Sequence, residues 1–351
     1  MPNNRRVLIT GNNGYIGSIM APWLRSQGYD VVGLDTGYFR PCMLVAEHGE
    51  IPTKRKDIRE VTAADLAGFD AVIHLAALSN DPIGNLNEAW TREINGQGTI
   101  RLAQLAKQAG VRRFLFSSSC IMYGMSEAAV VDETAPLAPQ TEYARSKVDA
   151  ETALGLLADD NFSPTFCRNG TIYGLSPCMR FDTVLNNLMG YAFTTGRVVI
   201  HSDGTPWRPV VHVQDVARAF QAVLEAPREL VHNEAFNTGA DALNHQIRDL
   251  GQIVCETVAG CELQMVPQPG ADQRTYKADF AKFKRTFPDF DFRWTARKGA
   301  EELYTSFKRI GLTPGEFTDK RFTRLSWLRH LLDSGALDDS LRWTQLTAQV
   351  A

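Results

Sequence analysis

The stretch VLITGNNGYIG, from Val7 to Gly17, decides the fold of this chain. A short apolar run rich in β-branched residues is followed by a glycine-rich loop and by the start of a helical segment. Gly11 would allow the tight turn, Gly14 would let the backbone approach a phosphate, and Gly17 would let the helix pack closely on the sheet. Three glycines alone fit a structural turn equally well, but the helix N-terminus that follows would offer free N–H groups to a diphosphate. The stretch therefore predicts a dinucleotide-binding βαβ unit.

The same alternation of strands and helices continues through the first half of the chain. Beyond the first strand, buried strands are predicted at Val31–Asp35, Ala71–Ala77 and Arg113–Ser118, and Thr165–Gly174 predicts another strand that runs into a loop. A helical stretch at Glu88–Gly110 ends on a glycine stop signal. This alternation is typical of a parallel sheet with helices on both faces. The predicted fold class is α/β, a Rossmann-type doubly wound parallel sheet with a smaller mixed C-terminal substrate-binding lobe.

The pattern changes after about residue 174, where loops and aromatic residues become more frequent. Asp215–Ala226 still predicts an amphipathic helix, and Glu234–Gly239 a short strand and turn. We therefore expect residues 1–174, with about 210–238, to form the dinucleotide-binding domain. Residues of about 175–209 and 239–351 would form the second lobe.

The composition excludes several classes of partner. The chain has 351 residues, of which 44% are hydrophobic and 22% charged, as in an ordinary soluble globular protein. Its net charge of −3 provides no positive field for a nucleic acid or an anionic membrane. No apolar run approaches the roughly 18 residues that a membrane span needs. We expect neither a nucleic acid nor a membrane as partner.

The cysteines and the N-terminus bear on the compartment. The six cysteines are scattered and form no CxxC pair, which argues against a zinc site and against a disulfide scaffold. No metal site is predicted. The N-terminal MPNNRRVLIT leads directly into a strand, so a secretory signal is not expected. These observations predict reduced thiols and a cytoplasmic location.

The end of the second predicted strand indicates which dinucleotide binds. Asp35 stands at that position. A carboxylate there can accept hydrogen bonds from both ribose hydroxyls and would repel the 2′-phosphate of NADP. The sequence therefore favours NAD as the cofactor.

A tyrosine and a lysine one helical turn apart provide a candidate for proton transfer. Tyr143 and Lys147, in YARSK, share one face of a helix that begins near Glu142. An ammonium close to a phenol favours the phenolate, so we expect the pKa of Tyr143 to be lowered towards the working range. The phenol could then exchange a proton with a substrate hydroxyl. Such a pair is also common on ordinary helix surfaces.

Taken together, the motifs identify a family. TGxxGxxG at the N-terminus, the serine triplet in FLFSSSCIMYG (Phe114–Gly124) and the YxxxK pair resemble the extended short-chain dehydrogenase/reductase family. The closer match is its nucleotide-sugar epimerase/dehydratase branch. The resemblance covers most of the chain, since it extends through HLAA, INGQGT, RNGTIYG, GTPWRPVVHVQDVA and the late DQRTY.

The resemblance implies a role for each matching residue. The catalytic residues would be Ser119, Tyr143 and Lys147. The cofactor-binding residues would be Gly11, Asn13, Gly14, Tyr15, Ile16, Gly17, Asp35, Asp57, Ile58, Leu75, Ala76, Ala77, Asn95, Ser117, Ser118, Tyr143 and Lys147. The substrate-binding residues would be Ser79, Asn80, Asp81, Ser119, Asn169, Asn186, Arg208 and Arg274.

Some of these assignments have an ordinary alternative. The two arginines match family arginines that bind the diphosphate of a nucleotide sugar, and a guanidinium suits that contact. Either arginine could instead be a solvated surface charge. SNDPIGNLN (Ser79–Asn87) could border the sugar, with Asn80 or Asp81 in reach, or form a solvent loop rich in turn residues.

The resemblance also implies a first chemical step, the oxidation of a sugar hydroxyl. Tyr143 would take the proton and Ser119 would hydrogen-bond the developing carbonyl. Dehydratases of this branch carry an Asp-Glu pair after the catalytic Ser/Thr, and related decarboxylases carry a Glu at the second of these positions. This chain has Cys120 and Ile121 there. Neither supplies a carboxylate, so C4 epimerisation through a transient 4-keto sugar is preferred.

Other functions remain open at this point. The chain could carry out net oxidation or reduction of a nucleotide-linked sugar, while dehydration is disfavoured. A non-catalytic dinucleotide-binding sensor is the alternative from another class, although such proteins readily lose the Tyr/Lys pair. Family members commonly form homodimers through two helices. Apolar stripes at Leu102, Leu105 and Ala106, and at Ala150, Ala153 and Leu157, fit such a dimer or burial within one subunit.

Overall fold

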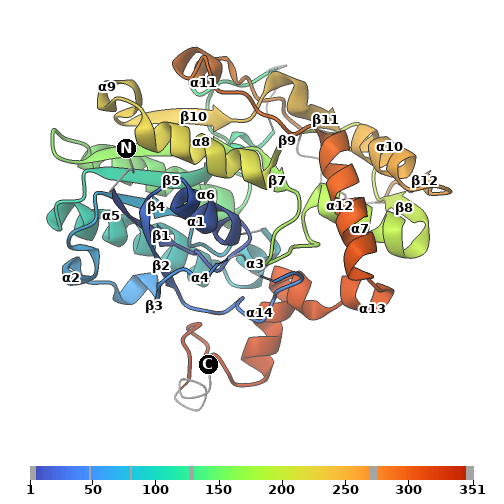
Figure 1. Ribbon diagram of the computed structural model, residues 1–351, viewed down its shortest axis with the longest axis horizontal. Coiled ribbons are helices and arrows are strands. Elements are labelled where there is room, and N and C mark those ends of the chain that lie inside the picture. The colour runs from blue at the N-terminus through green and yellow to red at the C-terminus, as the bar shows by residue number, and fades with distance from the viewer. Residues whose placement is uncertain (1–4, 47–48, 80, 126–129, 269–274, 345–351) are drawn as a thin grey trace.

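A parallel sheet of seven strands forms the centre of the molecule. The computed structural model describes residues 5–46, 49–79, 81–125, 130–268 and 275–344. The strand order is β10-β6-β5-β4-β1-β2-β3 (Figure 1). The strands are β1 (Arg6–Thr10), β2 (Asp30–Asp35), β3 (Thr53–Arg55), β4 (Ala71–His74), β5 (Arg113–Ser119), β6 (Ser163–Asn169) and β10 (Glu234–Thr238). The first six follow the doubly wound order 3-2-1-4-5-6, so the predicted fold class is confirmed.

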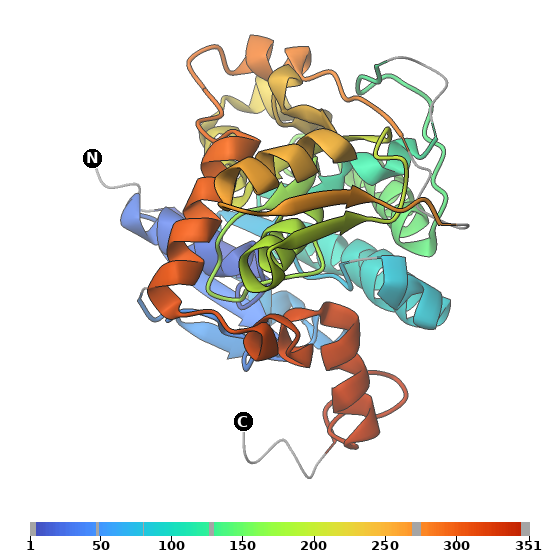
Figure 2. The ribbon, with the colours of Figure 1, turned by 90° about the vertical axis from the view of Figure 1, so that its right-hand side faces the viewer.

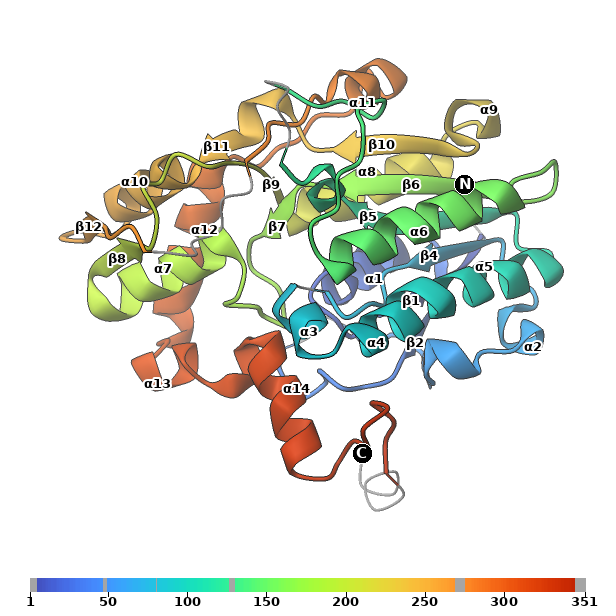
Figure 3. The same cartoon turned by 180° about the vertical axis from the view of Figure 1, so that it is seen from behind.

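Helices cover both faces of this sheet. On one face lie α1 (Gly17–Ser26) and α8 (Val213–Glu225), seen in front in Figure 1. On the other lie α5 (Thr99–Gln108) and α6 (Glu142–Leu157), seen in front in Figure 3. Val7 and Ile9 of β1 pack towards α1 and α8, whereas Leu8 joins the core beneath α5 and α6. Burial on both faces explains why β1 is a continuous apolar run.

Short helices complete this part of the chain. They are α2 (Ala63–Leu66), α3 (Asp81–Leu86), α4 (Glu88–Thr91), α9 (Arg228–Val231) and α11 (Ala281–Thr286). The helix predicted over Glu88–Gly110 is divided, because a π-helical segment at Arg92–Gly98 separates α4 from α5. Segments of this kind are frequent at functional sites, and this one carries Asn95.

The second lobe has its own small sheets and core. Its strands are β7 (Thr171–Tyr173), β9 (Trp207–His212) and β11 (Asn244–Gln246), together with the parallel pair β8 (Arg197–Ile200) and β12 (Glu262–Met265). Its helices are α7 (Val184–Thr195), α10 (Ile247–Thr257), α12 (Ala296–Ile310) and α13 (Pro314–Phe317), and Figure 2 shows this lobe facing the viewer. Phe181 packs edge to face against Phe307, Phe317 and Phe322 at the centre of this lobe.

The end of the chain leaves the second lobe and returns to the sheet. Helix α14 (Arg324–Asp333) buries Trp327, Leu328 and Leu331 in the same core as Tyr38. The predicted division placed everything from 239 to 351 in the second lobe. The structure places α14 elsewhere, because its apolar face is complementary to the dinucleotide-binding domain.

Two further observations concern the predicted homodimer and membrane spans. Leu102, Ala106 and Ala150, part of the stripes predicted to form a dimer, are buried within the single subunit. These three positions therefore carry no support for the predicted homodimer. Over the described residues, no helix combines the length and the apolar character that crossing a bilayer requires.

Candidate active site

A cavity of about 770 Å³ lies at the carboxyl ends of the sheet strands and continues to the second lobe. Ligands of open α/β sheets bind at this edge, where the strand order reverses. Most of the predicted cofactor residues line it, namely Gly11, Gly14, Tyr15, Ile16, Gly17, Asp35, Asp57, Ile58, Leu75, Ala76, Ala77, Ser117, Ser118 and Tyr143. Of the predicted substrate residues, Ser79, Asp81, Ser119, Asn169 and Arg208 line it. Their individual roles as ligands remain predictions.

The glycine-rich loop fits tightly between β1 and α1. Gly11 has φ +76°, and a Cβ added there would lie 2.8 Å from the backbone nitrogen of Ala76. A Cβ on Gly17 would lie 2.3 Å from the carbonyl oxygen of Gly11. Only glycine leaves this cradle open, so the backbone can approach a diphosphate at the start of α1.

Asp35 lies at the end of β2 with its carboxylate held by the backbone. Its oxygens accept hydrogen bonds from the N–H of Gly37 at 2.7 Å and the N–H of Asn13 at 3.1 Å. Burial raises the pKa of this carboxyl, and the two N–H donors oppose the rise. Asn13 therefore acts on the site through its backbone and is not among the cavity-lining residues. The remaining lone pairs of Asp35 suit the two hydroxyls of a ribose.

Asn95, a predicted cofactor residue, and His74 support the cavity from behind. The Asn95 side chain accepts from the backbone N–H of Leu78 at 2.8 Å and donates to its carbonyl oxygen at 3.0 Å. It thus fixes the segment that follows β4 but does not line the cavity. His74 bridges Thr10 and Thr99, and burial lowers its pKa to about 3, so it stays neutral and structural.

Helix α6 presents Tyr143 to the cavity beside the end of β5. The helix begins at an N-cap, where the Thr141 hydroxyl accepts from the N–H of Ala144 at 3.2 Å. Further along, Glu151 forms a buried ion pair of 2.7 Å with Arg168 of β6, which fixes the helix against the sheet. These contacts set the position of the phenol relative to the serine triplet.

Lys147 lies behind Tyr143 and is buried, with 4% of its surface exposed. Its Nζ donates to the carbonyl oxygen of Ser117 at 2.7 Å and lies 5.6 Å from the centre of the Tyr143 ring. Burial lowers the pKa of Lys147 to about 7, and Glu151 partly opposes this. Lys147 is not among the cavity-lining residues, so its predicted role in binding the cofactor remains a prediction.

The predicted lowering of the Tyr143 pKa is wrong for the free protein. Burial, followed by the nearby Asp81 carboxylate, raises the pKa of Tyr143 to about 12, whereas Arg180 acts in the opposite direction. The lysine does not reverse this, because desolvation weakens its own positive charge. Tyr143 therefore carries its proton until a ligand changes its surroundings.

The motif FLFSSSCIMYG (Phe114–Gly124) divides into residues at the cavity and residues behind it. Ser117, Ser118 and Ser119 stand at the carboxyl end of β5 and face the cavity. Tyr123 is buried and donates to Asn237 at 2.7 Å. The thiol of Cys120 donates to the carbonyl oxygen of Arg168 at 3.1 Å, and burial raises its pKa. Neither of these two reaches the cavity.

Several buried polar atoms at the cavity have no hydrogen-bond partner within the described part of the chain. These are the hydroxyls of Ser118 and Thr183 and the amide oxygen of Asn169. The amide nitrogen of Asn169 is already used, since it donates to Ser117 at 3.1 Å. Buried polar groups are nearly always paired, so these atoms indicate a polar ligand. Together with the glycine cradle and Asp35, they fit a dinucleotide next to a hydroxyl-rich substrate.

Three predicted substrate residues are not found at the cavity. One of them is buried away from it, and the other two lie outside the described residues. Asn186 is completely buried and donates to Tyr15 and to the carbonyl oxygen of Arg180, both at 3.0 Å. The structure does not place it at the cavity, so the predicted substrate contact of Asn186 is corrected to a structural role. Asn80 and Arg274 lie outside the described residues.

The structure adds cavity residues that the sequence reasoning missed. Arg180 bonds Asp182 at 2.8 Å and the hydroxyl of Ser79 at 3.0 Å, and both charged groups line the cavity. The close spacing of Arg180 and Asp182 just before α7 was an available signal. Arg324, at the start of α14, also lines the cavity and has no motif around it.

The match to a family model decides the identity of this architecture. Residues 7–239 match the model described as the NAD dependent epimerase/dehydratase family. The chain belongs to this family. The predicted resemblance to the nucleotide-sugar epimerase/dehydratase branch is confirmed. The chain is an enzyme, and its cofactor is NAD. The alternative of a non-catalytic dinucleotide sensor is thereby set aside.

Relatives and solved structures agree with this family. A UDP-glucose 4-epimerase from Bacillus subtilis (strain 168) is 29% identical over 328 residues, covering 85% of this chain and 94% of the relative. The structure of MoeE5 in complex with UDP-glucuronic acid and NAD has a TM-score of 0.75 at 26% identity, covering 88% of this chain and 100% of the other. The NDP-hexosamine 5,6-dehydratase TunA has a TM-score of 0.78 at 24% identity, covering 87% and 98%, and this likeness supports the fold.

This family member is therefore an NAD-dependent enzyme that modifies nucleotide-linked sugars. The sheet provides the dinucleotide cradle and the Ser119–Tyr143 pair. The second lobe and α14 provide the cations Arg180, Arg208 and Arg324.

Proposed function

We propose that this chain is a nucleotide-sugar C4 epimerase that works through a transient 4-keto sugar. The observation that carries the proposal is the lack of a carboxylate directly after Ser119. Cys120 is turned away from the cavity, and Ile121 lines the cavity with an apolar side chain. Dehydration requires an acid and a base beyond those that oxidise the sugar, and these two positions supply neither. The similarity to a UDP-glucose 4-epimerase supports the same choice.

Tyr143 is the group that moves the proton. Its phenol faces the cavity and carries its proton in the free protein, with a pKa of about 12. Bound NAD⁺ would supply the hydride acceptor and, through its positive charge, favour the phenolate. Tyr143 then accepts the proton of the sugar hydroxyl, and Ser119 donates a hydrogen bond to the developing carbonyl. The 4-keto sugar then rotates in the cavity so that its other face points towards the cofactor. Tyr143 returns the proton to the sugar oxygen as the carbonyl is reduced on that face.

Lys147 holds the serine end of β5 in place. Its ammonium donates to the carbonyl oxygen of Ser117, two residues before Ser119. Because its pKa lies at about 7, Lys147 changes charge near neutral pH. Its charged form stabilises the phenolate of Tyr143, so we expect the oxidation step to slow as Lys147 loses its proton.

Asp81 favours a second candidate, the loss of water from the keto sugar. Its carboxylate lines the cavity, accepts from the Thr141 hydroxyl at 2.6 Å and raises the pKa of Tyr143. A carboxylate at this place could serve as the acid or base that Cys120 and Ile121 do not provide. The two candidates therefore differ in whether Asp81 is needed for chemistry.

The test is to incubate the purified protein with a panel of nucleotide sugars in deuterated water. UDP-, dTDP-, GDP- and CDP-linked hexoses and UDP-glucuronic acid would form the panel. Epimerisation predicts a product of unchanged mass, no deuterium in the sugar and no net formation of NADH. A product lighter by one water would overturn the proposal in favour of dehydration. A change of two hydrogens would show net redox chemistry, and Asp81→Asn should leave epimerisation largely intact.

A further inference from the structure

Arg324 is a buried cation whose charge is only partly accounted for by the protein. It stands at the first position of α14 with 2% of its surface exposed, and it lines the cavity. Its Nη2 donates to the carbonyl oxygen of Cys178 at 3.1 Å. Its Nη1 is buried and has no hydrogen-bond partner among the described residues. A buried guanidinium nitrogen without an acceptor is costly, so this donor indicates a ligand.

The surroundings of Arg324 identify the end of the cavity to which it belongs. Its guanidinium lies 4.5 Å from the centre of the Phe39 ring, and Phe39 also lines the cavity. The charge of Arg324 acts to lower the pKa of two carboxyls. One is Asp35, at the place that suits the adenosine ribose, and the other is Asp182, which accepts from the backbone N–H of Arg324 at 3.2 Å. Thr36 and Tyr38 line the cavity between these groups. Arg324 therefore belongs to the adenosine end of the cavity.

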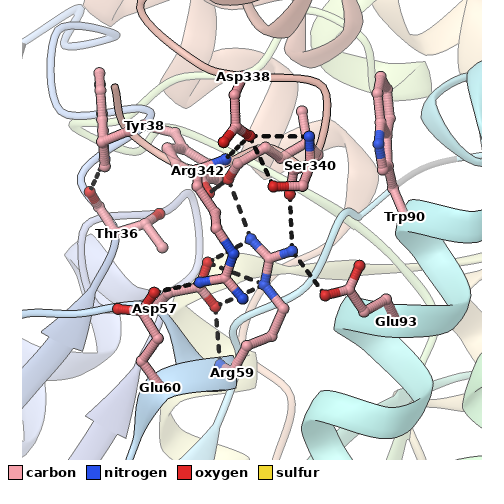
Figure 4. A network of polar contacts seen from close by, with 12 residues as sticks. Thr36, Tyr38, Asp57, Arg59, Glu60, Trp90, Glu93, Asp338, Ser340 and Arg342 are labelled. Carbon is pink, nitrogen blue, oxygen red and sulfur yellow. Dashed lines mark hydrogen bonds and ion pairs between the residues drawn. The ribbon is translucent and has the colours of Figure 1, made fainter. Parts of the chain in front are cut away.

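The chain beyond α14 fastens this helix to the adenosine end. We call residues Leu337–Trp343 the C-terminal strap. Figure 4 shows the strap over Arg59, whose guanidinium donates to the carbonyl oxygen of Ser340 at 2.8 Å and to Asp57 at 2.6 Å. The indole of Trp343 donates to the carbonyl oxygen of Thr36 at 2.7 Å. The strap thus bonds to the neighbours of the adenosine pocket.

The same anchoring continues into α14 itself. The indole of Trp327 donates to the carbonyl oxygen of Tyr38 at 2.7 Å, three residues after Arg324 in the chain. The hydroxyl of Tyr38 in turn bonds the carbonyl oxygen of Leu341 in the strap. Two indoles and one phenol therefore join α14 and the strap to the Thr36–Tyr38 segment. A side chain on α14 is held in a fixed place at this end of the cavity.

We propose that Arg324 is a cofactor-binding residue, and that its Nη1 donates to an oxygen of the adenosine diphosphate half of NAD. The acceptor is either a hydroxyl of the adenosine ribose or an oxygen of the diphosphate. The guanidinium suits both, since it is planar, always charged and fixed by its bond to Cys178. The C-terminal segment accordingly forms one wall of the NAD site.

The test measures binding of cofactor fragments to protein freed of its NAD. Arg324→Met and Arg324→Lys are compared with wild type and with Arg329→Met, a matched change at an exposed arginine of the same helix. ADP-ribose, adenosine, ADP and nicotinamide riboside are titrated by calorimetry. A charged hydrogen bond predicts that Arg324→Met weakens ADP-ribose binding roughly ten- to a hundredfold. Arg329→Met should bind ADP-ribose as wild type does, and no variant should change the binding of nicotinamide riboside, which carries no phosphate.

The fragments separate the two acceptors. Weaker binding of both adenosine and ADP places the acceptor on the ribose, whereas weaker binding of ADP alone places it on the diphosphate. Equal ADP-ribose affinity in wild type, Arg324→Met and Arg324→Lys would overturn the proposal. If Arg324→Met does not fold, the proposal is tested with Arg324→Lys. The measurement is then the rise in melting temperature that ADP-ribose causes in this variant and in wild type. A rise equal to that of wild type overturns the proposal, and a smaller one supports it. The readout does not involve a sugar, so it is independent of the proposed epimerase activity.

Discussion

The two sides of the cavity are built in different ways. The sheet side comes from short stretches of sequence, since a glycine loop, a strand end or one helical turn delivers several functional groups at once. The opposite side collects single residues from distant segments, such as Arg180 before α7, Arg208 on β9 and Arg324 on α14. The sheet side has the same geometry wherever this fold occurs, because strand and helix geometry fix it. The opposite side depends on how the lobe packs, so differences in substrate are expected to arise there.

The largest effect is expected on the sheet side, at Tyr143. Tyr143→Phe removes the proton-transferring hydroxyl and leaves the ring in place. Turnover should fall by about 10²–10⁴-fold, the usual contribution of a general acid or base. Binding of NAD should change little, since the phenyl ring still fills its place. Turnover of the best substrate and NAD content after purification are the measurements.

Tyr123→Phe is the matched control for this change. Tyr123 is a tyrosine of the same region, but its hydroxyl bonds Asn237 and Arg168 behind the cavity. Its loss should lower the melting temperature while turnover stays close to that of wild type. If both variants lost turnover equally, the assignment of the acid/base to Tyr143 would have to be abandoned.

The next largest effect is expected at the glycine loop. In Gly11→Ala the new methyl would lie 2.8 Å from the backbone nitrogen of Ala76, at a φ of +76°. The backbone must shift at the diphosphate cradle, so NAD affinity should fall by roughly tenfold or more, which corresponds to about 1.4 kcal/mol. Equilibrium dialysis with NAD measures this.

Gly110→Ala is the control for Gly11→Ala. It separates the backbone strain of a positive φ from the steric clash of the added methyl group. Gly110 has φ +81°, and nothing lies within 4 Å of an added Cβ. The variant carries a similar backbone strain of about 1–2 kcal/mol far from any cofactor contact. It should therefore lose stability in urea denaturation but keep its NAD affinity. Equal loss of NAD affinity in both variants would contradict a special role of the Gly11 cradle.

A smaller and more selective effect is expected on the lobe side, at Arg208. Arg208→Gln removes a positive charge from the cavity wall but leaves the dinucleotide cradle untouched. The KM for a nucleotide sugar should rise about tenfold, as expected for the loss of one charged hydrogen bond. NAD binding should remain as in wild type. A loss of NAD binding instead would show that Arg208 contributes to the cofactor site and not to the substrate site.

The sequence by itself determined the sheet side of this protein. The glycine loop, Asp35 and the Tyr143–Lys147 pair are local patterns, and a local pattern fixes the spacing of its own side chains. The fold class follows from the same regular alternation. Asn95 and Asn13 show the limit even here, because one works through a side-chain bond to Leu78 and the other through its own backbone.

Only the tertiary structure decided which distant side chains reach the cavity and what burial does to them. The sequence predicted that Asn186 binds the substrate, but its side-chain amide donates its hydrogen bonds to the Tyr15 hydroxyl and to the carbonyl oxygen of Arg180. Burial raised the pKa of Tyr143, against the expectation from its spacing to Lys147, and it lowered the pKa of Lys147. Arg324 came to the cofactor site because the apolar face of α14 packs on the sheet domain. Desolvation and long-range packing act across the folded molecule, so neither is written in a short stretch of sequence.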